Sequence, residues 1–258
     1  MKRKYLTMTL MALGLMLSAC GNNQKNEGAA VEGDSAKSES NINQTDDEEF
    51  EAPQRSIDVI RRKWAGKPIE VEAEDGVGIK ELALAFCKAY PQCETNRDLE
   101  EFLTSPNADK EEYVEEKDYP STEESSYRIY NQAPNGYLYC MLFTQTGRYT
   151  YACYWTRKDG HKLFAACMEE CWEQPSMEQC LVVFYDYDPA TGLMKPEPAL
   201  TNMIEERVKG DDYLCYYVSL PDEGKDIEVV GVISDEEDAS SEDMWVMKWN
   251  GQSFDWEE

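Results

Sequence analysis

The most restrictive feature of this sequence is a succession of short apolar and aromatic segments that begins near residue 126 and continues to the C-terminus. Runs of this length, bounded by glycine, proline or asparagine, are typical of strands joined by hairpins. Asp159-Gly160 and Asn250-Gly251 are strong two-residue hairpin signals. We therefore predict strands at 127–130, 137–143, 149–156, 162–172, 180–187, 193–195, 213–220, 227–233, 244–249 and 252–256.

Three of these segments, 137–143, 149–156 and 163–168, carry apolar side chains on both of their alternating faces. A strand with one face in water would alternate apolar and polar residues. These strands therefore belong at the centre of a sheet that is covered on both sides.

The part of the chain before residue 126 has a helical periodicity instead. Ile57, Ile60 and Trp64 recur at intervals of three and four residues, as one face of a helix requires. Thr95 and Asp98 have the spacing of a capping box, which indicates the start of a short helix. We predict helices at 53–66, 79–90 and 95–103 and a short one around residue 204, and a polar loop at 104–126.

Helices first and consecutive hairpins afterwards predict the α+β class, with N-terminal helices packed on a mainly antiparallel β-meander. We place a single globular domain at 53–258, helical over 53–104 and rich in strands over 126–258. A fragment of a β-propeller is the alternative, because the strand–turn units are weakly alike. They show no fixed period, however.

The first twenty residues have the pattern of an export signal and not of a folded element. Lys2, Arg3 and Lys4 give a positive start, and an apolar run over 5–17 follows. The run ends in Leu17-Ser18-Ala19-Cys20. This order of charge, apolar run, small residues and cysteine resembles the lipobox of bacterial lipoproteins, whereas the rest of the chain resembles no family that we can name.

The resemblance implies that the Cys20 thiol receives a diacylglycerol, that the chain is cut after Ala19, and that residues 1–19 are a signal peptide. The new amino terminus of such proteins usually receives a fatty acid such as palmitate, and several acyl chains together hold a soluble domain on a bilayer. The implied location is the bacterial cell envelope, and Gly21 favours the outer membrane or cell surface where there are two membranes. A secretory signal with a chance cysteine is the alternative.

Residues 20–52 contain almost no large apolar side chains, so we predict a lipidated cysteine followed by a disordered acidic tether. The whole chain has 25 basic and 52 acidic residues, a net charge of −27. Loss of residues 1–19 removes three basic residues and no acidic one, which brings the charge to −30. Because so negative a surface is repelled by phosphate backbones, we predict no nucleic-acid partner.

Nine cysteines are present, and eight remain besides the one in the lipobox. An exported chain permits disulfides. Symmetrical turns at 146–147 and 175–176 would place cysteines of neighbouring strands opposite each other at non-hydrogen-bonded positions. The Cα atoms of such a pair are about 4.5 Å apart. We predict two neighbouring pairs as candidate disulfides, Cys140 with Cys153 and Cys171 with Cys180, and reduced core thiols are the alternative.

No catalytic, cofactor-binding or metal-binding constellation stands out. The single histidine, His161, follows a turn and is expected to be an exposed hairpin residue. Zinc is not expected, because there is no Cys-x-x-Cys pair and Cys167 and Cys171 lack histidine support. The acidic run 235–238 could hold calcium loosely, but without the glycine of an EF-hand loop we favour a solvated loop.

Trp245, Trp249 and Trp256, together with 16 tyrosines, could form a stacking surface for glycans or peptides. Burial in the core is the favoured alternative, because Trp245, Met247 and Trp249 alternate as one face of a strand does.

The leading functional hypothesis is a lipid-anchored envelope protein, a non-catalytic binding or accessory module for an unknown protein or glycan. A carboxylate-dependent envelope enzyme, such as a glycan hydrolase, is the alternative. Two convergent carboxylates in a cleft, one with a raised pKa, would favour the enzyme, whereas a flat or filled sheet surface would favour binding.

Overall fold

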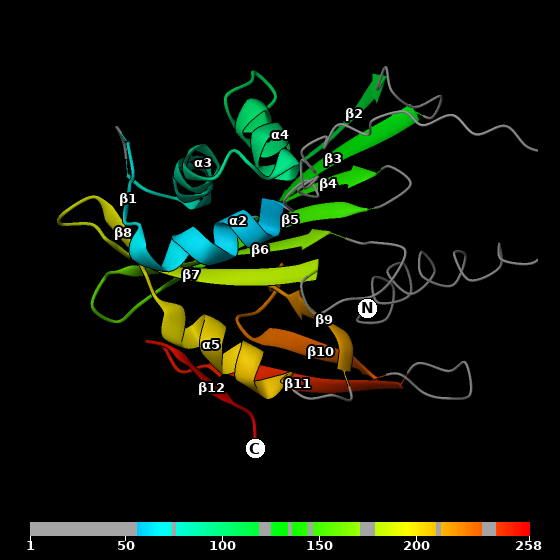
Figure 1. The fold of residues 1–258 in the computed structure, drawn as a ribbon. Helices are drawn as coiled ribbons and strands as arrows, with labels where there is room; N and C mark the ends of the chain where they lie inside the picture. The colour runs from blue at the N-terminus through cyan, green and yellow to red at the C-terminus, as the bar shows by residue number, and fades with distance from the viewer. Residues whose placement is uncertain are drawn as a thin grey trace, which may run out of the picture. The chain divides into compact units, whose positions relative to one another are not determined.

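The computed structural model describes a large part of the chain within one compact unit, Glu51–Glu258 (Figure 1). The described residues are 56–73, 76–118, 125–133, 136–143, 147–170, 179–209, 213–233 and 241–258. The predictions for residues 1–52, namely the signal peptide, the lipid on Cys20 and the tether, fall outside them. Within these ranges, no helix has the length and apolar composition needed to cross a bilayer.

The larger of two sheets has eight antiparallel strands in the order β1-β8-β7-β6-β5-β4-β3-β2. From β2 to β8 each strand pairs with the next along the chain, so the sheet is a meander, and β1 joins it at the β8 edge. This arrangement confirms the α+β class, and one continuous sheet of eight strands replaces the blades of a propeller. The strands are β1 (Ile69–Glu70), β2 (Glu112–Asp118), β3 (Ser125–Ala133), β4 (Tyr137–Phe143), β5 (Arg148–Thr156), β6 (Lys162–Glu170), β7 (Cys180–Asp188) and β8 (Leu193–Pro196).

The smaller sheet is an antiparallel meander of four strands, in the order β12-β11-β10-β9. Helix α5 (Pro198–Arg207) connects the two sheets, and its proline stands at the helix start, where a missing N–H costs nothing. The strands are β9 (Tyr213–Ser219), β10 (Ile227–Ile233), β11 (Ser241–Trp249) and β12 (Phe254–Trp256).

The remaining helices are α2 (Ser56–Lys63), α3 (Ile79–Ala89) and α4 (Glu94–Leu103), and a 3₁₀ turn, η2 (Trp64–Gly66), follows α2. They lie over one face of the large sheet, while α5 and the small sheet lie on the other side (Figure 1). Each helix buries an apolar stripe against the sheet, as the fully buried Ile60, Leu82 and Leu99 illustrate.

The strands β6 and β7 contribute to two cores at once. Phe164 and Val183 face the helices, whereas Leu163, Val182 and Phe184 face the small sheet. Successive side chains of a strand point to opposite faces, so a run of apolar residues feeds both cores. The prediction of cover on both sides, made for 137–143, 149–156 and 163–168, is confirmed for the last of these, β6.

Two local predictions are wrong. Part of the predicted loop at 104–126 is strand β2, which pairs along its whole length with β3 at the edge of the sheet. Helix α4 begins at Glu94 with Cys93 at its N-cap, so Thr95 does not cap it. The Thr95 hydroxyl lies instead 2.6 Å from the Thr150 hydroxyl of β5, in the buried contact between helix and sheet.

Candidate functional site

Stacked tyrosines lie on the face of the large sheet opposite the helices. Tyr139 of β4 is paired with Tyr151 of β5, and their rings stack at a centroid distance of 5.8 Å and an angle of 16°. Tyr149 stacks on Tyr151 at 5.9 Å and 7°. We call Tyr139, Tyr149 and Tyr151 the tyrosine row; all three side chains are half-buried.

The same face continues onto β6 and β7. Tyr151 is paired with Cys167 and Tyr149 with Glu169, and Glu169 is paired in turn with Cys180 of β7. Because residues two apart on a strand share a face, Cys167 and Glu169 stand side by side. We call Cys167, Glu169 and Cys180 the thiol cluster.

The thiol cluster is compact and buried. The Cys167 and Cys180 sulfurs are 3.7 Å apart, and the Cys167 sulfur is 3.9 Å from Glu169 Oε1. Both cysteines are buried, and Glu169 is 9% exposed. Burial raises the pKa of the Glu169 carboxyl to about 7, although the backbone N–H of Val218 donates a hydrogen bond to it. Among the described residues, these three are the group whose ligand atoms lie close enough together to hold a metal ion.

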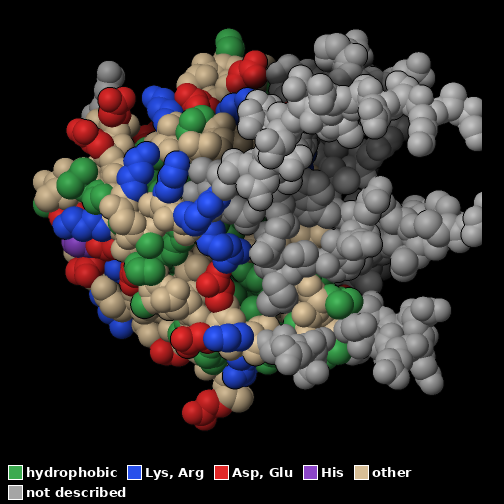
Figure 2. All heavy atoms as spheres, viewed as in Figure 1, with side chains coloured by type: hydrophobic (Ala, Val, Ile, Leu, Met, Phe, Trp, Pro, Cys, Tyr) green, Lys and Arg blue, Asp and Glu red, His purple; other side chains and the backbone are tan. Residues whose placement is uncertain are grey.

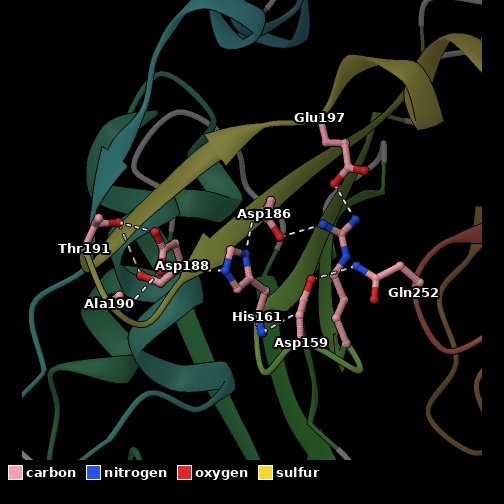
Figure 3. Close-up of polar contacts among 9 residues, drawn as sticks. Asp159, His161, Asp186, Asp188, Ala190, Thr191, Glu197 and Gln252 are labelled. Atoms are coloured by element: carbon pink, nitrogen blue, oxygen red, sulfur yellow. Dashed lines mark hydrogen bonds and ion pairs between the residues drawn. The ribbon is translucent and has the colours of Figure 1, made fainter.

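A second polar network joins the end of the β5–β6 hairpin to the neighbouring loops (Figure 3). The buried Arg157 donates to Asp186 Oδ1 at 2.5 Å and to Glu197 Oε2 at 2.6 Å. His161 Nδ1 lies 2.8 Å from Asp186 Oδ2, and its Nε2 lies 3.8 Å from Asp188 Oδ1. Asp186 therefore accepts from Arg157 on one oxygen and contacts the His161 ring on the other.

This network also reaches the small sheet. Asp159 accepts from the His161 backbone N–H at 3.0 Å and from Gln252 Nε2 at 2.9 Å (Figure 3). Gln252 lies in the turn between β11 and β12, so the contact connects the two sheets. The carboxylates of this network are bonded to Arg157, His161 and Gln252, so the network has a structural role: it connects the hairpin end to its neighbours. His161 follows the turn as expected and its side chain is 34% exposed, but its contacts with Asp186 and Asp188 were not predicted.

Cys140 and Cys153, the first predicted cysteine pair, are not neighbours. Cys140 is paired with Thr150, and Tyr137 is paired with Cys153, so the register of β4 on β5 differs by three residues from the predicted one. A register shift by an odd number of residues places two side chains that were predicted to share a face on opposite faces of the sheet. Cys140 therefore faces the helices and Cys153 the small sheet, and both are free thiols.

The second predicted pair is not tested by the described residues. The β6–β7 register places Glu169 opposite Cys180, where we had predicted Cys171. Cys171 itself lies outside the described residues. A register shift of two residues leaves each side chain on the same face of the sheet. Cys180 therefore still faces the side of β6 that carries cysteines, and its neighbour there is Cys167.

The three tryptophans near the C-terminus are half-buried, so the favoured alternative of buried rings holds in part. Trp245, Trp249 and Trp256 pack against the apolar cluster between the sheets. The Arg207 guanidinium lies over the rings of Trp245 and Trp256, at 5.4 and 5.2 Å from their centroids. The acidic run 235–238 lies outside the described residues.

The described surface is not uniformly acidic. Lys and Arg side chains gather on the face seen in Figure 2, in the region of α2, whose last turn consists of Arg61, Arg62 and Lys63. Cations in the last turn of a helix are stabilised by its dipole, so this cluster has a structural explanation.

Comparison of the chain with protein-family models, curated proteins and solved structures finds no match. Function must therefore be argued from the residues themselves. Sequence analysis missed both the tyrosine row and the thiol cluster. The signals were present as Tyr149-x-Tyr151 and Cys167-x-Glu169, each with the two-residue period of a single strand face.

Proposed function

We propose that this protein is a lipid-anchored, non-catalytic binding module of the bacterial cell envelope, and that a neutral glycan stacks on its tyrosine row. The lipobox-like segment ending at Cys20 supports the anchor. The observation that carries the binding function is the parallel stacking of Tyr139, Tyr151 and Tyr149 on one sheet face.

The tyrosine row suits a sugar for two reasons. A row of parallel aromatic rings offers apolar contact area to a pyranose, and phenol hydroxyls can bond its hydroxyl groups. Burial raises the pKa of Tyr139 and of Tyr151, so their hydroxyls stay protonated at neutral pH. A chain with a net charge of −27 repels anionic polymers, so a neutral glycan is the better fit.

The binding proposal is tested with the full chain on an array of neutral and acidic glycans. We expect binding to neutral glycans that the double variant Tyr139→Ala/Tyr149→Ala loses by about tenfold or more, in line with about 1 kcal/mol per lost ring contact. Tyr154→Ala, a ring of the same strand outside the row, is the matched control and should bind as the wild type does. Equal binding by all three proteins would refute the proposal.

The anchor is tested separately by metabolic labelling with a fatty acid. The wild type should take up the label and Cys20→Ala should not. If the wild type stays unlabelled, or the variant is still labelled, the chain is not a lipoprotein.

One observation favours the hydrolase alternative, namely the pKa of about 7 at Glu169, which suits a general acid. A hydrolase also needs a second carboxylate across the substrate. In the described part of the chain Glu169 faces two thiols and a backbone amide, which supports binding over catalysis. Release of reducing sugar by the wild type that Glu169→Gln abolishes would reverse this choice.

A further inference from the structure

We propose that Cys167, Glu169 and Cys180 form a binding site for one zinc ion between the two sheets. Two sulfurs and one carboxylate oxygen, from strands β6 and β7, lie within 4.8 Å of one another. The site adjoins the tyrosine row, because Tyr151 is paired with Cys167 and Tyr149 with Glu169, but the zinc proposal does not depend on the proposed glycan function.

The distances match those of a zinc tetrahedron. Zinc–sulfur bonds of about 2.3 Å at tetrahedral angles place two sulfurs about 3.8 Å apart, and a zinc–oxygen bond of about 2.0 Å places oxygen and sulfur about 3.5 Å apart. The observed separations are 3.7 Å between the Cys167 and Cys180 sulfurs and 3.9 Å from the Cys167 sulfur to Glu169 Oε1. Small side-chain rotations are enough to bring the three atoms onto one ion.

A disulfide fits this pair less well. Cys167 is paired with Val182, and Cys180 with Glu169, so the two cysteines are diagonal neighbours across β6 and β7. Diagonal positions in an antiparallel sheet have Cα atoms about 7–8 Å apart. A disulfide spans at most about 6.8 Å between Cα atoms, so forming one would require the backbone to move.

The groups around the thiol cluster would orient its ligands and balance its charge. The Val218 backbone N–H of β9 bonds both the Glu169 carboxyl and Cys180, and so fixes two of the ligands from the facing sheet. The Arg61 guanidinium donates to the Cys180 carbonyl at 3.0 Å. Two thiolates and a carboxylate with one Zn²⁺ carry a net charge of −1, which this cation partly offsets.

Zinc binding here involves no change in oxidation state. The two S–H bonds and the carboxyl O–H bond, where protonated, release their protons to the buffer, and two Zn–S bonds and one Zn–O bond form. The thiolates select a soft or borderline ion such as Zn²⁺ over calcium or magnesium. Three protein ligands leave the fourth position of the tetrahedron to water or another ligand.

The test uses the full reduced chain titrated with Co²⁺ as a spectroscopic substitute and then with Zn²⁺ as competitor. We expect one equivalent of Co²⁺ to produce thiolate charge-transfer absorption and the visible bands of a tetrahedral ion, both removed by Zn²⁺. Cys167→Ser and Cys180→Ser should each weaken binding by about 100-fold or more, and Glu169→Gln less strongly. Cys153→Ser changes a buried free thiol of the same core and should bind as the wild type does.

A second readout separates loss of a ligand from loss of the fold. Excess Zn²⁺ should raise the melting temperature of the wild type and of Cys153→Ser, because a ligand that binds only the native state stabilises it. Folded Cys167→Ser should show no such rise. The proposal is overturned if the wild type gives no thiolate absorption with Co²⁺, if the cysteine variants keep it, or if mapping of the air-oxidised chain finds a Cys167–Cys180 disulfide that forms in the presence of zinc.

Discussion

His161 shows how a residue in a turn can acquire a defined electrostatic role. Its ring lies between Asp186 and Asp188, and the hydrogen bond to Asp186 is the main cause of its raised pKa. Its position after a hairpin turn was predicted from the sequence, but its partners were not. Its partners lie on β7, which pairs with β6 directly after this turn.

The raised pKa of His161 predicts a pH-dependent contribution to stability. The folded state binds the proton more tightly than the unfolded state, so the contribution is fully present below the unfolded pKa of about 6.5 and is lost as pH rises through the folded-state value. His161→Gln should therefore destabilise the protein more at pH 5.5 than at pH 8.5, as measured by urea unfolding. Lys158→Gln, in the same turn, serves as the control. An equal loss at both pH values would show that packing, and not charge, explains the effect.

Thr95 shows why local signals mislead at single residues. Its spacing to Asp98 has the form of a capping box, yet its hydroxyl lies within hydrogen-bond distance of Thr150, which in turn donates to Asn96 at 3.1 Å. A buried hydroxyl needs a partner, and the sheet supplies one that no local pattern reveals. Burial against the sheet therefore decides the role of this side chain.

At the scale of elements, most strands could be predicted but their pairing could not. Predicted segments such as 137–143 and 227–233 agree with β4 and β10 to the residue, because apolar patterning and turn residues mark them locally. Register depends on where the connecting turn is centred. The observed pairing of β4 with β5 differs by three residues from the pairing that a turn at 146–147 would give. The pairing of Cys140 with Cys153 was wrong, and the thiol cluster was missed, because both depend on register.

Strand β6 should be the most sensitive element to substitution, because it is covered on both faces. Phe164 is fully buried and lies 5.8 Å from the ring of Phe86. Phe164→Ala should lower the free energy of unfolding by about 3–5 kcal/mol, through lost burial and the cavity left behind. Urea unfolding should show a lower midpoint with an unchanged m-value.

The matched control for this strand is Met244→Ala on β11, where the side chain is 63% exposed. Removal of an exposed side chain should change stability by no more than about 0.5 kcal/mol. A cost for Phe164→Ala as small as that of the control would mean that β6 is not at the centre of the fold.

At the scale of the molecule, the division into two sheets was not predicted, although its parts were. The local pattern marks the central strands of the eight-stranded sheet, which are apolar on both faces, but it does not show that the strands after α5 form a sheet of their own. The division follows from packing: one face of β6 and β7 needs a cover, and the strands after α5 provide it. This non-local choice also encloses the thiol cluster between the sheets.

The net charge of −27 gives a prediction for the whole molecule. Self-repulsion of like charges destabilises the compact state, and salt screens it over about 10 Å at 0.1 M. Salt also weakens ion pairs such as Lys80–Asp109, but an exposed pair contributes at most about 1 kcal/mol. With 27 acidic residues in excess, the repulsion that salt screens should be larger than the ion-pair energy that salt removes. The melting temperature at pH 7 should therefore rise with added NaCl.

Near the isoelectric point of 4.3 this rise should disappear. A melting temperature that falls with salt at pH 7 would mean that ion pairs, such as those of Arg157, dominate the electrostatics of the fold.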